Sequence, residues 1–124
     1  MSFVDLMLDE ELLLALAEHE FNQPTAIQNK AIPPLLEGSN LLASAPTGTG
    51  KTLAFVLPAL QHILDTPRHE PGTPKVLILS PTRELARQTF DQIQQLIANT
   101  HLKSCLIVGG VPFGMQKAML AEHI

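Results

Sequence analysis

Apolar positions at the start of the chain recur at helical spacing. This pattern predicts two short helices, one over residues 9–19 and one over residues 25–32. Two consecutive prolines, Pro33 and Pro34, are expected to end the second helix, because proline has no backbone N–H to donate. The front of the chain, residues 1–39, is therefore predicted to be a helical region.

From residue 40 onward, short apolar runs alternate with helical patterns. The runs, at 40–45, 75–80 and 104–108, have the character of strands that are buried on both faces. Such an alternation predicts an α/β fold with a parallel sheet and helices on both of its faces. Residues 40–124 are assigned to this second part. Its helices are expected at 50–64, with a bend at Pro58, and at 83–98 and 113–123.

Composition indicates a globular chain and limits its partners. The 124 residues are 45% hydrophobic and 16% charged, with a formal net charge of −4. Residues 1–24 hold six acidic residues and no Lys or Arg, so the rest of the chain is slightly positive. These values exclude a disordered tail and a surface that is basic throughout, which is the usual property of a nucleic-acid binder.

The chain contains one cysteine, Cys105, which excludes an internal disulfide and a zinc site built on cysteines. Its apolar neighbours favour a buried position in a strand. The start of the chain has no basic segment followed by a long apolar run, so it does not resemble a secretory signal. No apolar run reaches the roughly 18 residues of a membrane helix. We therefore expect a cytoplasmic protein that does not enter a membrane.

The strongest chemical signal lies between the first predicted strand and the helix that follows it. Its residues fit the phosphate-loop pattern, with Ala in place of the first Gly. Glycines let successive backbone N–H groups face phosphate oxygens, and the helix start adds its positive dipole end. Lys51 is expected to reach the phosphates and Thr52 to bind Mg²⁺, so these two are the predicted catalytic residues. The loop consists of Ala45, Pro46, Thr47, Gly48, Thr49, Gly50, Lys51 and Thr52.

Upstream of the loop, residues 20–28 read Glu-Phe-Asn-Gln-Pro-Thr-Ala-Ile-Gln. This segment resembles the Q motif of the DEAD-box family of ATP-dependent RNA helicases, Gly-Phe-x-x-Pro-Thr-x-Ile-Gln. Residues 45–52 are similar to the family's motif I, residues 81–86 to its motif Ia, and Gly109-Gly110 to its GG element. The resemblance spans nearly the whole chain and implies a RecA-like P-loop NTPase fold, with ATP, Mg²⁺ and RNA as ligands. The nearest likeness is to bacterial ribosome-assembly helicases, which implies ribosomal RNA.

The resemblance assigns roles to the residues of the Q motif. A glutamine amide offers a donor and an acceptor side by side, so Gln28 is suited to the adenine edge of ATP. Phe21 is expected to stack on the base, with Thr25 and Phe3 supporting the pocket. Core packing remains the alternative for both phenylalanines. Glu20 replaces the family's glycine, which alters the local backbone if that position requires a positive φ.

Motif Ia and the GG element are implied to grip the RNA backbone. Pro81, Thr82 and Arg83 stand at a predicted helix start, where N–H groups and a guanidinium suit phosphate oxygens. The alternative is simple helix initiation, with Thr82 as the N-cap. Gly109 and Gly110 would let the backbone approach a phosphate, although a plain strand end is equally consistent. A few phosphate contacts of this kind do not require a basic chain.

The sequence also lacks parts that hydrolysis needs. After Lys51 no acidic residue ends an apolar run, and neither Asp-Glu-Ala-Asp nor Ser-Ala-Thr is present. In the family the strands of those two motifs lie between the strands of motif I and motif Ia. We therefore expect an N-terminal fragment with a gap in its sheet. This fragment would be inactive in ATP turnover on its own and prone to associate with another copy.

Two other functions remain open on the sequence. The first is a small-molecule kinase that uses the same loop, although it gives residues 21–28 no role and needs an arginine lid that is not seen. The second is a non-catalytic remnant that binds nucleotide weakly. Adenine specificity that depends on Gln28 would separate the helicase from the kinase.

Overall fold

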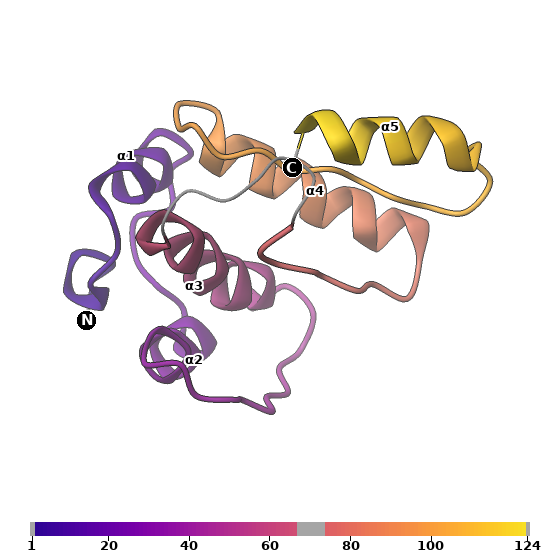
Figure 1. Ribbon diagram of the computed structural model, residues 1–124. Coiled ribbons are helices and arrows are strands. Elements are labelled where there is room, and N and C mark those ends of the chain that lie inside the picture. Colours follow the sequence, from indigo (N-terminus) through magenta and orange to yellow (C-terminus); the bar gives the residue numbers. More distant parts are fainter. Residues whose placement is uncertain (1, 67–73, 124) are drawn as a thin grey trace. The chain divides into compact units, whose positions relative to one another are not determined.

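A computed structural model describes residues 2–66 and 74–123. Contacts divide the chain into two compact units, Met1–Thr66 and Pro67–Ile124 (Figure 1), and each is described by itself. None of the helices in the described ranges combines the length and the apolar character needed to cross a membrane. The elements are η1 (Val4–Leu6), α1 (Glu10–Glu18), α2 (Ala26–Leu36), α3 (Lys51–Asp65), α4 (Arg83–Ile97) and α5 (Phe113–His123).

The first unit is built around α3, the most apolar of its helices. Helix α2 packs against α3, and η1 contacts α2. Burying one aliphatic side chain stabilises the folded state by about 1.5–3 kcal/mol relative to leaving it in water. The unit therefore has an apolar centre that fixes the start of α3 relative to α2. Its most completely buried side chains are Leu12, Leu16, Ile32, Val56 and Leu57.

Helix α1 confirms the first predicted helix and ends in a Schellman motif. The N–H of Glu20 donates to the Ala17 carbonyl at 3.1 Å, and that of Phe21 donates to the Leu16 carbonyl at 2.8 Å. Glu20 adopts a φ of +62°, a conformation that favours glycine. This position therefore does require a positive φ, the condition under which replacing the family's glycine by Glu20 was expected to affect the local backbone.

Helix α2 runs past the prolines that were expected to end it. It continues to Leu36, and both Pro33 and Pro34 lie inside it. A proline removes only its own donor, and its carbonyl still accepts. The N–H of Glu37 donates to the Pro33 carbonyl at 3.2 Å, and that of Ser39 to the Pro34 carbonyl at 3.0 Å. The predicted end at residue 32 is therefore wrong by one turn.

In the second unit, α4 and α5 confirm the two predicted helices. The predicted strands, one in the first unit and two in the second, are not seen in the described residues. Within residues 2–66 and 74–123, no segment forms a strand, so the parallel sheet is not confirmed. The prediction that the apolar runs are buried on both faces is wrong for three of their leucines. The side chains of Leu42, Leu77 and Leu79 are 100%, 82% and 84% exposed. The physical reason is that an apolar run becomes a strand only when a neighbouring backbone pairs with it.

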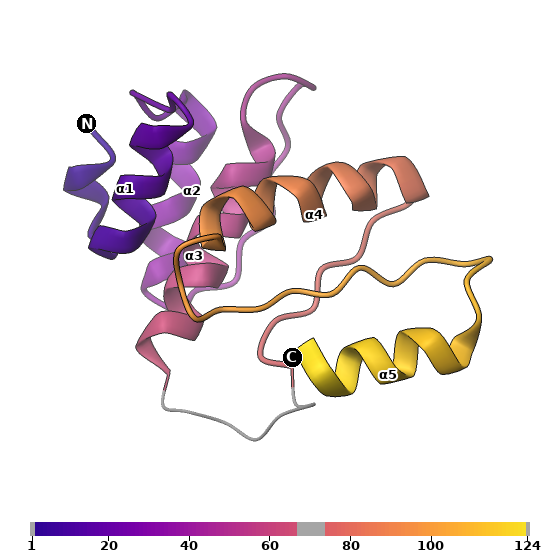
Figure 2. The same cartoon turned by 90° about the horizontal axis from the view of Figure 1, so that it is seen from above.

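The run at 104–108 is instead tethered by side chains of the two flanking helices. Figure 2 shows this segment passing between α4 and α5. The Ser104 hydroxyl donates to Gln94 Oε1 at 2.6 Å, and the Val108 N–H donates to Gln116 Oε1 at 2.7 Å. Cys105 lies half-buried in the same run, where desolvation raises the pKa of its thiol.

Candidate functional site

The phosphate loop forms a tight turn directly before α3. Gly48 and Gly50 have φ values of +84° and +82°, so both occupy the region in which glycine carries no steric penalty. The Thr49 hydroxyl donates to the Pro46 carbonyl at 2.6 Å and closes the turn. Thr47 and Gly48 are exposed at its tip, and the half-buried Ala45 leads into it.

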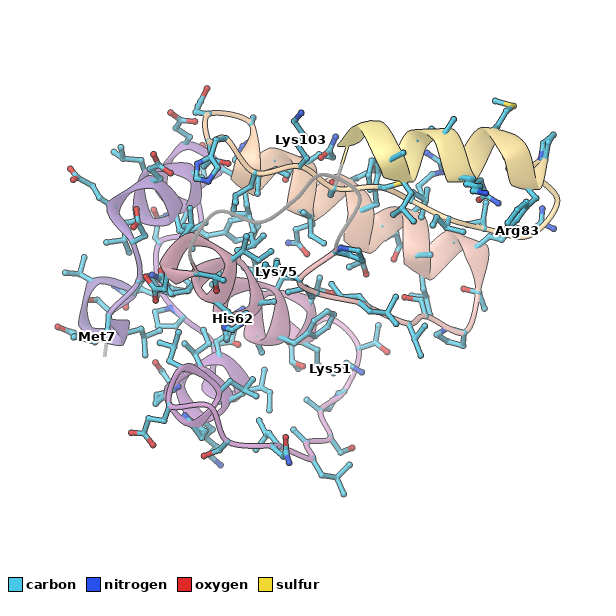
Figure 3. All side chains as sticks on the ribbon, viewed as in Figure 1. Met7, Lys51, His62, Lys75, Arg83 and Lys103 are labelled. Atoms are coloured by element: carbon cyan, nitrogen blue, oxygen red, sulfur yellow. The ribbon has the colours of Figure 1, made fainter. Side chains whose placement is uncertain are left out.

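The start of α3 is open to a ligand. Gly50 is the N-cap and provides no side-chain cap for the helix. The first N–H that bonds back into the helix is that of Ala54, to the Gly50 carbonyl at 3.3 Å. The N–H groups of the first turn therefore have no partner within the helix and face the loop with the positive end of the dipole. Lys51, labelled in Figure 3, is exposed at this end, and Thr52 is half-buried beside it. Such a donor set fits the phosphates of a nucleotide.

Gln28 forms a capping box at the start of α2. The Thr25 hydroxyl oxygen accepts from the Gln28 N–H at 3.5 Å, and Gln28 Oε1 accepts from the Thr25 N–H at 2.9 Å. The side-chain Nε2 donates to the carbonyl of Gly50 at 3.0 Å. One carboxamide therefore joins the cap of α2 to Gly50, the residue of the phosphate loop that directly precedes α3.

The loop and the cap are in close contact at Gly50. A Cβ placed on Gly50 would collide with Gln28 Nε2 and would lie 3.2 Å from the Thr25 hydroxyl oxygen. Gln28 itself is only 2% exposed. The absence of a side chain at Gly50 is therefore what lets the Q-motif residues reach the phosphate loop.

The adenine-side residues differ in their surroundings. The Gln28 amide has one further N–H and one further lone pair beyond the two bonds described above, so it keeps capacity for a base edge. Phe21 is half-buried directly after the Schellman motif, and Thr25 is exposed. Phe3 precedes η1 and is only 5% exposed, so for this residue the structure supports the core-packing alternative.

In the second unit, the residues of motif Ia and the GG element are exposed and adjacent. Thr82 is the N-cap of α4, and its hydroxyl oxygen accepts from the Leu85 N–H at 3.1 Å. Arg83 extends from the first position of α4 toward the turn before α5 (Figure 3). A Cβ on Gly110 would lie 3.0 Å from Arg83 Nη2, and one on Gly109 would lie 3.9 Å from it. The guanidinium therefore lies against this turn, next to the exposed Pro81 and Thr82.

Two contacts of these sites had no signal in the sequence. Gln28 and Gly50 are 22 residues apart, and no local pattern indicates that the amide reaches the loop carbonyl. Gln116 likewise lies in a segment that the sequence predicted only to be helical, yet its side chain binds the backbone beside the GG turn. Both are contacts between a side chain and a distant backbone group, which periodicity cannot reveal.

Comparison with known proteins decides the family. Residues 25–124 match the DEAD/DEAH box helicase family. The chain belongs to this family. It is 52% identical over 122 residues to the ATP-dependent RNA helicase SrmB of Escherichia coli (strain K12), a match that covers 98% of this chain and 28% of that one. It is 54% identical over 111 residues to SrmB of Haemophilus influenzae, over 90% of this chain and 25% of that one. The predicted resemblance to DEAD-box RNA helicases is confirmed, and the similarity is to the SrmB type.

Solved structures of a DEAD-box protein and of an RNA helicase have a similar backbone. A DEAD-box protein from Methanococcus jannaschii is 35% identical with a TM-score of 0.81, over 98% of this chain and 32% of that one. The RNA helicase Prp28 from Chaetomium thermophilum, bound to ADP, is 32% identical with a TM-score of 0.84, over 98% and 30%. This DEAD-box chain therefore spans less than a third of the relatives it matches. The two alternative functions, a small-molecule kinase and a non-catalytic remnant that binds nucleotide weakly, are not favoured.

Proposed function

We propose that the first unit of this DEAD-box chain binds ATP and that the second contacts the RNA backbone. The parent protein would couple ATP hydrolysis to RNA unwinding. The observation that supports the nucleotide site best is the bond from Gln28 Nε2 to the Gly50 carbonyl. It brings a residue suited to adenine next to a helix start suited to phosphates.

The phosphates are proposed to lie at the start of α3. Backbone N–H groups of the loop from Ala45 to Gly50 would surround the phosphate oxygens, and Lys51 would neutralise charge on the terminal phosphates. The Thr52 hydroxyl would ligate Mg²⁺ that arrives with ATP. When bound, the ion would compensate phosphate charge, while the residues of the chain hold the nucleotide in place. Gly50 fits this role because it leaves the first turn of α3 without a side-chain cap.

The adenine base is proposed to contact Gln28 and Phe21. The free N–H and lone pair of the Gln28 amide would match the edge of adenine and mismatch that of guanine. Phe21 would cover the face of the base, and Thr25 would hold Gln28 through the capping box. The buried Phe3 would support the site indirectly from the core.

RNA is proposed to bind along the start of α4 and the GG turn. Successive phosphates would be bound by the Arg83 guanidinium and by backbone groups on either side of it. These groups are the N–H groups that follow Pro81 and Thr82 and the backbone of Gly109 and Gly110. The support is that the Arg83 guanidinium already lies against Gly110, with both residues exposed. Ribosomal RNA as the physiological substrate rests only on the similarity to SrmB.

The three apolar runs, at 40–45, 75–80 and 104–108, are proposed to join a RecA-like parallel sheet with helices on both faces when their neighbouring strands are present. Without those strands, exposed leucines such as Leu77 and Leu79 favour association with a second copy. Sedimentation of the 124-residue chain tests this, and a monomer at all concentrations would contradict it. A cytoplasmic location is proposed from the single cysteine and the family.

Displacement of a fluorescent ATP analogue from the chain tests the nucleotide site. ATP should displace it, GTP should not, and Lys51→Met should lose binding altogether. Gln28→Glu keeps an acceptor for the Thr25 N–H and removes the donor to Gly50 and to the base, so it should lose adenine preference. Because it places a carboxylate at a buried position beside the Gly50 carbonyl, circular dichroism must show that the variant is folded before displacement is compared. Equal displacement by ATP and GTP from the wild-type chain would contradict the proposal.

A further inference from the structure

The segment before the GG turn is held at both of its ends by glutamine side chains. Gln94 of α4 accepts from the Ser104 hydroxyl, and Gln116 of α5 accepts from the Val108 N–H. The second bond, at 2.7 Å, is the one that holds the backbone, and Val108 directly precedes Gly109. Gln116 is half-buried in the first turns of α5, where its own N–H donates to the Pro112 carbonyl at 3.3 Å.

The turn that follows Val108 carries the Arg83 contact. Gly110 has a φ of +85°, and a Cβ placed there would lie 3.0 Å from Arg83 Nη2 and 3.2 Å from Nη1. Both nitrogens thus lie near the position that a Cβ of residue 110 would occupy, so the guanidinium lies against the turn rather than pointing away from it. The position of this guanidinium depends on where the turn is held.

We propose that Gln116 is a positioning residue for RNA binding. By accepting the Val108 N–H, it fixes the Gly109-Gly110 turn at the place where it supports the Arg83 guanidinium. This inference rests on the proposed function, because it assumes that Arg83 binds RNA phosphate. Gln116 itself does not touch the RNA.

The physical effect is on the number of phosphate contacts. If the turn is free to move, it does not hold the Arg83 guanidinium in one position. The side chain then loses conformational entropy when it binds phosphate, and this loss weakens binding. Losing one well-placed cation lowers the affinity and reduces its dependence on salt, because fewer counterions are released. A purely structural role of Gln116 would lower the melting temperature without changing that salt dependence.

The test measures binding of a fluorescein-labelled ten-nucleotide oligouridylate to the 124-residue chain at several KCl concentrations. Gln116→Met keeps the length of the side chain and removes the acceptor. Gln94→Met is the matched control, since it removes the tether at the other end of the same run. We expect Gln116→Met to weaken binding about threefold to tenfold with a smaller salt dependence, and Gln94→Met to change it less than about twofold.

A double-mutant cycle with Arg83→Met separates the possible outcomes. If Gln116 acts through Arg83, Gln116→Met should have no further effect in the Arg83→Met background. Additive effects, or equal effects of the two glutamine variants, would overturn the inference. An unchanged affinity in Arg83→Met alone would instead contradict the proposed RNA site.

Hydrogen exchange of the wild-type chain gives a second readout if Gln116→Met does not fold. The Val108 N–H should exchange more slowly than that of Ile107, whose side chain is 52% exposed in the same run. Equal exchange of the two amides would show that the bond to Gln116 does not hold the segment and would overturn the inference.

Discussion

The carboxamide nitrogen of Gln28 donates a hydrogen bond of 3.0 Å to the carbonyl oxygen of Gly50, 22 residues further along the chain. This bond joins the start of α2 to the start of α3, because each residue stands at the N-terminus of one of these helices. The residue proposed to recognise adenine is thereby linked to the loop proposed to hold the phosphates. A change at either residue should affect both parts of nucleotide binding.

Gly50→Ala should abolish nucleotide binding and destabilise the first unit. The new Cβ would collide with the Gln28 amide, and alanine at a φ of +82° adds strain of about 1 kcal/mol. Gly38→Ala is the matched control, because Gly38 has a φ of +90° and no atom within 4 Å of the added Cβ. Urea unfolding should show destabilisation by backbone strain in both variants and a further loss from the collision in Gly50→Ala. Analogue displacement should show loss of binding only in Gly50→Ala. Intact binding by Gly50→Ala would contradict the link to Gln28.

Glu20→Gly should stabilise the chain by about 1 kcal/mol, since glycine relieves the left-handed strain at the end of α1. Helix α2 ends in the same motif with Gly38 at the corresponding position, where the Gly38 N–H donates to Leu35 and that of Ser39 to Pro34. Ala17→Gly, within α1, should have the opposite sign. Thermal unfolding measures both changes, and a lower melting temperature for Glu20→Gly would contradict the assignment of left-handed strain to Glu20.

Gly110→Ala should weaken binding of oligouridylate about fivefold. The added Cβ would lie 3.0 Å from the Arg83 guanidinium and displace it, and a φ of +85° disfavours alanine. Gly114→Ala serves as the control, because Gly114 lies in α5 with no atom within 4 Å of an added Cβ. It should leave the affinity unchanged and stabilise the helix by about 0.5–1 kcal/mol. Equal affinities of the two variants would argue against the Arg83 site.

The pKa of the Asp5 carboxyl should lie below its usual value of 3.8, chiefly because the Ser2 backbone N–H donates to it and secondly because the Ser2 hydroxyl does. These bonds have lengths of 2.9 and 3.0 Å. The folded state favours the charged form, so this stabilisation is present above pH 3.8 and is lost as the pH falls through the lower folded pKa. Ser2→Ala removes only the hydroxyl bond and should move the pKa part of the way back. An NMR titration of Asp5 that shows no difference between the two chains would contradict this.

Local signals predicted the helices of this chain well, because caps and periodicity act over a few residues. Thr82 does cap α4, as the sequence indicated, and Asp9 caps α1 in the same way. The end of α2 was misplaced, since proline at positions 33 and 34 removes donors and leaves acceptors that continue the helix. The positive φ at residue 20 was anticipated only through the glycine of the family motif.

The strands and the arrangement of the site depended on partners that a periodic pattern does not contain. The apolar run with Leu77 and Leu79 has the composition of a buried strand, yet pairing and burial come from other segments. The phosphate loop could be located by its spacing, whereas the contact of Gln28 with Gly50 required the packing of α2 against α3. Likewise, the approach of Arg83 to Gly110 follows from the path of the chain between α4 and α5.

Backbone amide NMR of the 124-residue chain during titration with ATP and Mg²⁺ tests whether the phosphate loop and Gln28 form one nucleotide site. The signals of Gly48, Gly50, Lys51 and Thr52 should shift together with the side-chain amide of Gln28, whereas GTP should leave the Gln28 signal unmoved. Shifts elsewhere in the chain with these signals unchanged, or the same Gln28 shift with both nucleotides, would contradict it.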